Sequence, residues 1–312
     1  LQMRKKNEED RLKLVNDLST RLNNVQGEFN KMSRFKSFRE LKATNGRPDL
    51  TDITVNNEEA EPGTYFLEIK QLAGRSSMIS NGFADADDTQ IGVGYFSYDL
   101  PSGETKEIYI GEDENTLHGI AAKINSDKDL DLQALVVNDG TGTEEPWRLI
   151  VSHKFTGEEH DAEYPDFYFT DGDADFYMDQ EQPAQNSIIN VNGFDLEFDS
   201  TKINSLIPGV TLDLKEAAPG KPFQINITED RAKIEGKIKT LVEKINEVLT
   251  FIQQQNQIDD KTDTTKTLGG DVTIQNIESL MRRMVSEPVE TREGLVRFGD
   301  MGVSFQRNGL LE

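Results

Sequence analysis

Two stretches near opposite ends of the chain share the same 4-3 spacing of apolar residues. The first contains Val15, Leu18, Leu22, Val25, Phe29 and Met32, and the second contains Ile234, Ile238, Leu241, Ile245, Val248 and Ile252. This spacing places apolar side chains along one narrow seam of a helix, and such a seam is stable in water only when another helix covers it. We therefore expect the two ends to pack together as an antiparallel coiled-coil-like stalk, in which these seam residues carry the structure.

The sequence also predicts where the helices of this stalk begin and end. Pro48 cannot continue a helical hydrogen-bond ladder, and Thr228 can cap a helix. A third apolar seam, Ile274, Ile277, Met281 and Met284, follows the sequence Gly-Gly-Asp and precedes Pro288. The expected helices run over residues 11–42, from Thr228 to about Gln257, and over residues 271–287.

Alternating apolar residues predict strands between these helices. The run Tyr65–Lys70 alternates, and residues 188–191 lead through Asn192 and Gly193, a strong hairpin signal, into the alternating residues 194–198. Because two strands do not make a stable sheet, we expect segments far apart in the sequence to share one. The fold class is therefore α+β, with a helical stalk and two nested β-rich head domains. The expected domains are 1–45 with 229–312, 46–74 with 184–228, and an inserted domain 75–183 with one short helix at residues 116–125.

Charge is distributed unevenly along the chain. The formal net charge is −23, residues 1–45 carry 11 basic and 6 acidic side chains, and residues 75–183 carry 6 basic and 25 acidic side chains. Phosphate binding needs a basic stripe, so we expect no nucleic-acid partner. A solvated, self-repelling surface is the simplest interpretation of the acidic residues 75–183, and cation or glycan binding are the alternatives.

The sequence contains little that indicates catalysis or bound metal. It has no cysteine, its three histidines lack a paired metal-ligand spacing, and no P-loop or G-x-S-x-G motif occurs. Residues 127–138 and 171–182 begin like calcium loops but lack the required glycine and glutamate. We expect no enzyme activity, no cofactor and no metal. Apolar runs are also too short for a membrane span. The chain begins with Leu1 and its helical pattern is already running within a dozen residues, so we expect a segment of a longer protein.

One aromatic run stands out within the acidic residues. Residues 164–178 contain seven aromatic or methionine side chains among four carboxylates. Aromatic rings beside acidic acceptors bind sugar rings or the apolar patch of a partner, whereas the inner face of a strand pair would give the same pattern. Tyr168 and Tyr177 are the candidate contact residues.

In order along the chain, several motifs resemble the flagellar hook-associated protein 2 family, the filament cap proteins. Residues 63–73 (GTYFLEIKQLA) and 115–125 (NTLHGIAAKIN) are similar to family motifs, and so are shorter segments at 134–139, 148–152, 190–193, 207–214, 268–271, 299–303 and 308–310. Each segment is a weak signal alone, but they occur in the family's order from about residue 12 to residue 311.

The resemblance implies a structural role. Members of this family are exported by the flagellar secretion apparatus without a cleaved signal peptide, and they form a ring at the extracellular tip of the flagellum. There they promote flagellin insertion and prevent flagellin loss. The implied partners are further copies of the chain in a homo-oligomer, flagellin and the hook–filament junction proteins. Some relatives also act in adhesion.

Three other functions stay open from the residues alone. A secreted adhesin or carbohydrate-binding surface protein with an acidic, calcium-stabilised head would fit the charge pattern. A carbohydrate hydrolase or lyase would need a pair of carboxylates that the sequence does not single out. Another axial flagellar component, such as a junction protein, would also have a stalk, although a nested double insertion favours the cap.

Overall fold

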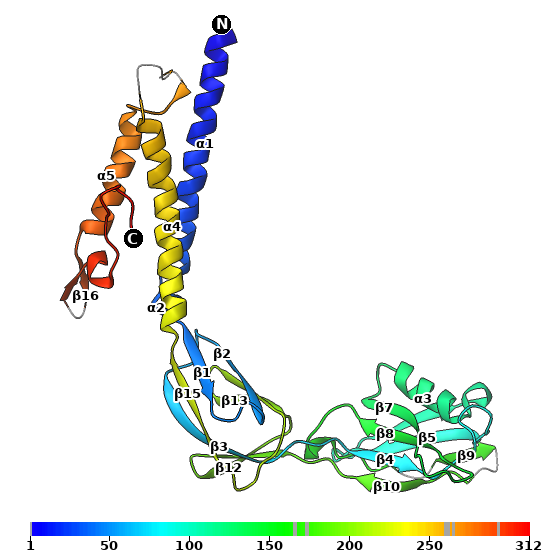
Figure 1. Ribbon diagram of the computed structural model, residues 1–312. Coiled ribbons are helices and arrows are strands. Elements are labelled where there is room, and N and C mark those ends of the chain that lie inside the picture. The colour runs from blue at the N-terminus through cyan, green and yellow to red at the C-terminus, as the bar shows by residue number, and fades with distance from the viewer. Residues whose placement is uncertain (1, 165–166, 172–174, 259–262, 264–265, 292–293) are drawn as a thin grey trace. The chain divides into compact units, whose positions relative to one another are not determined.

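In a computed structural model, the chain divides into two compact units, Leu1–Glu40 with Glu229–Glu312, and Leu41–Thr228. The structure describes residues 2–164, 167–171, 175–258, 263, 266–291 and 294–312. The fold combines helices and sheets, with a long N-terminal helix and several antiparallel sheets (Figure 1). This mixture of helices and antiparallel sheets agrees with the predicted α+β class.

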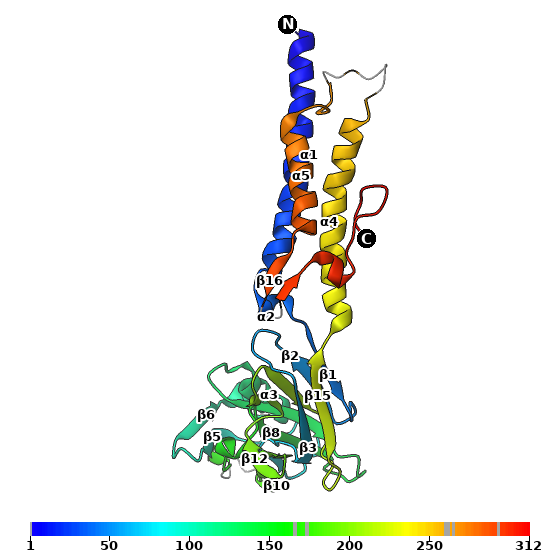
Figure 2. The same cartoon turned by 90° about the vertical axis from the view of Figure 1, so that its left-hand side faces the viewer.

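The first unit, called the helical unit below, is built from segments at both ends of the chain. Its elements are α1 (Gln2–Lys31), α2 (Phe35–Phe38), α4 (Arg231–Asn256), α5 (Val272–Ser286), the hairpin β16 (Val289–Thr291) and β17 (Gly294–Val296), and a 3-10 turn at Phe298–Met301. Figures 1 and 2 show α1 and α4 side by side and running in opposite directions, with α5 beside them. Ion pairs between nearby helical residues, such as Lys239 with Glu235, lie on the exposed faces.

The bounds predicted for the first helix, residues 11–42, are wrong. The observed helix α1 begins at Gln2 and ends at Lys31, and Leu41–Asn45 form strand β1. The reason is long-range: β1 hydrogen-bonds to a strand at residues 223–229, and local helix propensity cannot compete with a completed sheet edge. The start of α4 also differs, because the carboxylate of Asp230, and not Thr228, accepts the capping hydrogen bond from the Lys233 amide.

Within residues Leu41–Thr228, two sheets surround one hydrophobic core. The strands are β1 (Leu41–Asn45), β2 (Thr51–Val55), β3 (Gly63–Gln71), β11 (Ser187–Val191), β12 (Phe194–Phe198), β13 (Lys202–Ile207), β14 (Val210–Leu214) and β15 (Phe223–Glu229). They form a five-stranded sheet, β1-β15-β3-β11-β12, and a three-stranded sheet, β13-β14-β2. Leu67, Ile189 and Ile225 are at most 1% exposed in the core between them. Strands more than a hundred residues apart thus share one sheet, as predicted.

The Asn192–Gly193 hairpin forms as the sequence predicts. Val191 pairs directly with Phe194, and both turn residues have positive φ, 50° and 97°, as a tight two-residue hairpin loop requires. The alternation in β12 does not produce burial, however. On this edge strand Phe194 and Leu196 are 74% and 41% exposed, and of the alternating residues only Phe198 packs against the core.

A second hydrophobic core lies within residues 75–183, called the acidic segment below. Its elements are β4 (Ser77–Ser80), β5 (Val93–Asp99), β6 (Thr105–Ile110), α3 (Leu117–Ser126), β7 (Leu132–Asn138), β8 (Trp147–His153), β9 (Tyr168–Asp171), β10 (Met178–Gln182) and 3-10 turns at Glu112–Glu114 and Glu158–His160. They make the sheets β10-β4-β8-β7 and β6-β5-β9. Thr116 caps α3, whose apolar stripe is buried as expected.

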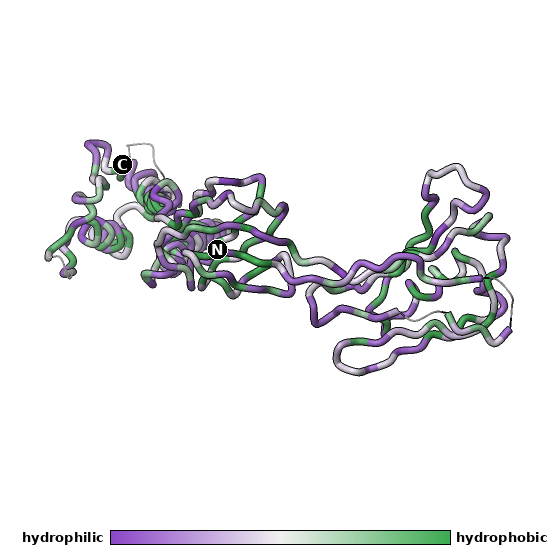
Figure 3. Tube along the Cα trace, turned by 90° about the horizontal axis from the view of Figure 1, so that it is seen from below, coloured by the Kyte–Doolittle hydropathy of each residue, from purple (hydrophilic) through white to green (hydrophobic). Residues whose placement is uncertain are grey.

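Polar and apolar residues alternate along much of the chain trace, as Figure 3 shows. In strand β5 of the acidic segment, Phe96 and Tyr98 are buried in the core, whereas Tyr95 and Asp99 are exposed to solvent. The predicted division of the sheet-containing residues into a nested pair, 46–74 with 184–228 and 75–183, stays a prediction.

Candidate functional site

Most of the predicted seam residues meet in one hydrophobic cluster of the helical unit. Leu18 and Val25 of α1 and Leu241, Ile245, Val248 and Ile252 of α4 are buried, and Leu22, Phe29, Met32 and Ile238 pack against them half-buried. Ile234 is half-buried outside this cluster. The structural importance of each seam residue stays a prediction.

Val15 differs from its expected place. Its side chain is 48% exposed, and Leu14 packs against the cluster instead. The same one-residue displacement occurs in α5, where Val285 is buried and Met284 is 49% exposed. A straight helix has 3.6 residues per turn, so a strict seven-residue repeat moves around its surface by about 20° per heptad. The displacement at both helix ends has this physical cause.

An apolar cavity of about 360 Å³ lies in the helical unit. Val25 and Phe29 of α1, Ile245 of α4 and Met281 of α5 line it, together with Phe298 from the 3-10 turn. Sequence periodicity could not identify Phe298, because the segment after Pro288 has no helical repeat. The cavity shows that the helices leave apolar space between them that an apolar side chain could fill.

The aromatic run of the acidic segment divides between core and surface. Tyr164, Phe167 and Phe176 are at most 6% exposed in the core, whereas Tyr168 and Tyr177 are 68% and 41% exposed. Tyr177 lines a polar cavity that Tyr168 does not reach. The structure therefore places the two candidate contact residues on separate surfaces.

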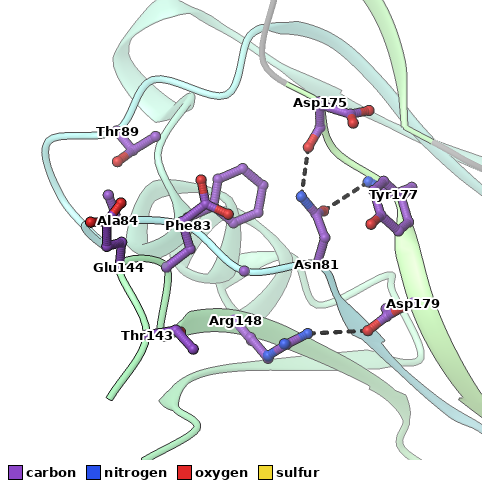
Figure 4. Close-up of a pocket in the computed structure, with 12 residues that line it drawn as sticks. Asn81, Phe83, Ala84, Thr89, Thr143, Glu144, Arg148, Asp175, Tyr177 and Asp179 are labelled. Atoms are coloured by element: carbon purple, nitrogen blue, oxygen red, sulfur yellow. Dashed lines mark hydrogen bonds and ion pairs between the residues drawn. The ribbon is translucent and has the colours of Figure 1, made fainter. Parts of the chain in front are cut away.

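The polar cavity beside Tyr177 has a volume of about 860 Å³ and is drawn in Figure 4. Arg148 of β8 donates to Asp139 Oδ2 (Nε, 2.8 Å), to the Ser80 carbonyl (Nη1, 3.0 Å) and to Asp179 Oδ2 (Nη1, 3.3 Å). Asn81 donates to the Asp175 carbonyl and accepts from the Tyr177 amide. These contacts hold the ends of strands β4, β8 and β10 together around the cavity.

Sequence reasoning missed this cavity because its polar residues come from distant segments. Asn81, Arg148 and Asp179 carry no shared motif, and only the strand order β10-β4-β8 brings them together. Glu144 and Glu145 also line the cavity and are exposed. The arrangement offers carboxylate oxygens, the Asn81 amide and the rings of Phe83 and Tyr177 to a polar ligand.

The ion pair of Asp139 and Arg148 beside this cavity stays charged at neutral pH. Hydrogen bonds from Arg148 first, and from Thr141 next, lower the pKa of Asp139 to about 2. The same contact raises the pKa of Arg148. Neither group can exchange a proton near pH 7, so the pair positions strands and does not provide acid–base chemistry.

The histidines lie apart from this cavity. His118 lies on α3, and its Nδ1 is 2.8 Å from Asp87 Oδ1. His153 is 1% exposed and stacks on His160, with the two ring centroids 5.1 Å apart. Burial, opposed by a hydrogen bond from the Phe155 amide, lowers the pKa of His153. Among the residues that the structure describes, no three His, Asp or Glu side chains converge as metal ligands.

Within the described ranges, no helix is both long enough and apolar enough to cross a membrane.

Comparison with known proteins identifies relatives at both ends of the chain. Residues 1–76 match the family described as Flagellar hook-associated protein 2 N-terminus, and residues 184–312 match Flagellar hook-associated protein 2 C-terminus. The A-type flagellar hook-associated protein 2 of Pseudomonas aeruginosa is 25% identical over 96% of this chain, and the flagellar hook-associated protein 2 of Xenorhabdus nematophila is 23% identical over 89%. The chain spans 66% and 65% of the lengths of these relatives.

Two solved structures are also similar. The flagellar cap protein FliD of Bdellovibrio bacteriovorus is 41% identical with a TM-score of 0.52, and the match covers 58% of this chain and 98% of that one. The D1-D2-D3 domains of the flagellar cap protein FliD of Escherichia coli are 20% identical with a TM-score of 0.70, covering 96% of this chain and 84% of that one. The second likeness concerns the fold alone.

Proposed function

Because the chain belongs to the flagellar hook-associated protein 2 family, we propose that it acts in the structural cap of a bacterial flagellar filament. The observation that carries this proposal is that the two family matches cover both ends of the chain and include all of the helical unit, Leu1–Glu40 with Glu229–Glu312. Its work is steric, and the proposal includes no catalytic step.

In this proposal the helical unit is the assembly part. Antiparallel α1 and α4 act as a coiled-coil-like stalk, and residues 46–74 with 184–228 and 75–183 form two nested head domains. The side chains of Leu280, Met284 and Leu295 are 53%, 49% and 69% exposed, so the helical unit offers apolar surface to a partner. Copies of the chain form a ring at the filament tip, where flagellin subunits are inserted and retained. Hook–filament junction proteins are further partners.

The proposed location is the extracellular tip of the flagellum. Export would use the flagellar secretion apparatus without a cleaved signal peptide. A second role in adhesion is favoured by the exposed Tyr177 beside the carboxylate-lined cavity, a chemistry that suits sugar hydroxyl groups. A glycan array with wild type and Tyr177→Ala tests that role, and equal signals from both proteins would exclude this cavity.

A deletion strain tests the capping role. Loss of swimming together with flagellin monomers in the medium is expected, and the wild-type gene should restore both. Normal swimming without leaked flagellin would contradict the proposal.

Light scattering over a concentration series tests self-assembly of the purified chain. The double substitution Leu280→Gln with Met284→Gln should reduce oligomer formation. Both side chains are exposed on the helical unit and are not among its buried core residues, so the change removes apolar surface that a second copy could cover. Leu135→Gln is the matched control, since Leu135 is 60% exposed but lies in the acidic segment. Equal effects of the two changes would argue against a helical assembly surface.

A further inference from the structure

Three tyrosines lie side by side across the sheet β6-β5-β9. Tyr95 of β5 pairs directly with Tyr109 of β6 and with Tyr168 of β9. Directly opposite residues project from the same face of an antiparallel sheet, and the rings of Tyr95 and Tyr109 are 5.2 Å apart. The three side chains are 39%, 50% and 68% exposed, while Phe96 and Ile108 on the other face are buried. The sheet thus presents one continuous aromatic row to solvent.

Carboxylates lie on both sides of this row. Glu107 of β6 is two residues from Tyr109 and opposite Ser97, and Asp171 of β9 is opposite Val93. Both side chains are exposed. Throughout the described part of the chain, no ion pair involves Glu107 or Asp171, so no described cation neutralises their charges.

A cavity of about 320 Å³ adjoins the row at the Asp171 end. Asp171, Glu112, Gln90 and Asn115 supply its polar lining, with Val93 between the cavity and Tyr95. Carboxylate oxygens accept hydrogen bonds and do not donate them, so this lining is richer in acceptors than in donors.

We propose that this face binds a polypeptide segment that carries arginine side chains. A guanidinium group has five donors and no acceptor, which complements the carboxylates, and its plane stacks on tyrosine rings. The net charge of −19 on the acidic segment, from 25 acidic and 6 basic residues, attracts a cationic partner and repels a polyanion.

Other partners fit this chemistry less well. An apolar partner would bury Glu107 and Asp171 without counter-charges, which is costly. A sugar hydroxyl both donates and accepts, so it would use an acceptor-rich lining only in part. The proposal goes beyond filament capping and does not depend on it.

Fluorescence anisotropy with the complete chain tests this inference. The probe is a labelled eight-residue peptide in which arginine alternates with threonine, and its control replaces each arginine with citrulline, which keeps the shape but removes the charge. We expect the arginine peptide to bind at 50 mM salt and to weaken at 300 mM salt, with the citrulline peptide at least about tenfold weaker.

Variants of the chain locate the binding site. Tyr95→Ala should weaken binding about fivefold and Glu107→Gln about threefold, because an exposed cation–π contact or ion pair contributes roughly 0.5–1 kcal/mol. Tyr95→Phe keeps the ring and should bind within about twofold of wild type. Tyr177→Ala is the matched control at the separate cavity and should also bind normally. Thermal melts of all variants separate lost binding from lost folding, since cross-strand aromatic pairs also stabilise a sheet.

Three results would overturn the proposal. Equal binding of the citrulline peptide would remove the role of charge. If Tyr95→Ala and Tyr177→Ala weaken peptide binding equally, the peptide does not bind at the tyrosine row. If Tyr95→Ala does not fold, an unchanged peptide affinity of Glu107→Gln would exclude this face instead. Tyr95-dependent binding of cellohexaose, without binding of the arginine peptide, would identify a sugar-binding face instead. Swimming should be normal in Tyr95→Ala, which separates this site from capping.

Discussion

The helical unit and the acidic segment differ in how they treat their apolar residues. Val248 and Ile252 are completely buried in the helical unit, yet the side chains of Leu280, Met284 and Leu295 in the same unit are about half exposed or more. In the acidic segment, Phe96 and Leu149 belong to a closed core, and most of the large apolar side chains left in solvent are tyrosines. An aliphatic surface suits dry packing against another protein, whereas phenol rings among carboxylates suit a wet, salt-sensitive contact.

The largest expected effect comes from opening the closed core. Phe96→Ala should lower the free energy of unfolding of the acidic segment by about 3–5 kcal/mol, because the ring is 0% exposed and leaves a cavity. Trp147, the only tryptophan, packs against this core, so its fluorescence during urea unfolding measures the change.

Phe66→Ala is the control for that substitution, since Phe66 is 56% exposed on β3. It should change the tryptophan transition by less than about 0.5 kcal/mol. Similar losses in both variants would remove the difference between closed and open surfaces.

A smaller effect is expected in the helical seam. Leu18→Ala should cost about 2–4 kcal/mol, because Leu18 is 6% exposed between α1 and α4. Val15→Ala should cost less than about 0.5 kcal/mol, since that side chain is already 48% exposed. Circular dichroism at 222 nm during urea unfolding measures the loss of the helices. Equal losses in the free energy of unfolding for Leu18→Ala and Val15→Ala would indicate that Val15 belongs to the seam, as the heptad spacing alone predicts.

The third expected effect is a pH dependence of the stability of the acidic segment, which contains the buried His153. The folded-state pKa of His153 is lowered from its usual 6.5 by burial, with His160, Lys106 and Asp131 as the charged or titratable groups around it. The unfolded chain therefore binds a proton first, so this contribution to stability is complete above about pH 6.5 and is lost as the pH falls.

We expect the tryptophan transition to weaken between pH 7 and pH 5 by less than the Leu18→Ala cost. His153→Asn keeps an acceptor for the Phe155 amide but does not titrate, so its transition should depend less on pH over the same range. An identical pH dependence in wild type and variant would exclude His153 as the source.

The smallest effect concerns the ion pair at the polar cavity. With the pKa of Asp139 lowered to about 2 by Arg148, its stabilising charge is present above pH 3.8 and is lost only as the pH falls toward 2. Arg148→Met should raise this pKa toward 3.8, measured by an NMR titration of the Asp139 carboxyl carbon. Lys123→Met is the control, because Lys123 pairs with Glu114 and should leave Asp139 unchanged.

Local patterns predicted the elements whose residues contact near neighbours in sequence. The heptad spacing identified α4 and predicted its end at about Gln257, one residue beyond the observed Asn256, and Asn192–Gly193 identified the β11–β12 turn. The helix predicted over residues 11–42 extends into strand β1 (Leu41–Asn45), and the sequence did not reveal this strand because its partner, β15, lies far away in the sequence. The same limit hid the row of Tyr95, Tyr109 and Tyr168, since only strand register places these residues together.

The pairing of β1 with β15 also sets the order of folding. Strand β1 ends at Asn45 and its partner begins at Phe223, so the five-stranded sheet cannot close until all of the intervening chain and β15 have been synthesised. Contacts between such distant residues form slowly, because the ends of a long loop must first meet. A nascent chain of this protein therefore stays open at that sheet until strand β15 emerges, and any chaperone or transport step that needs an unfolded polypeptide has that interval in which to act.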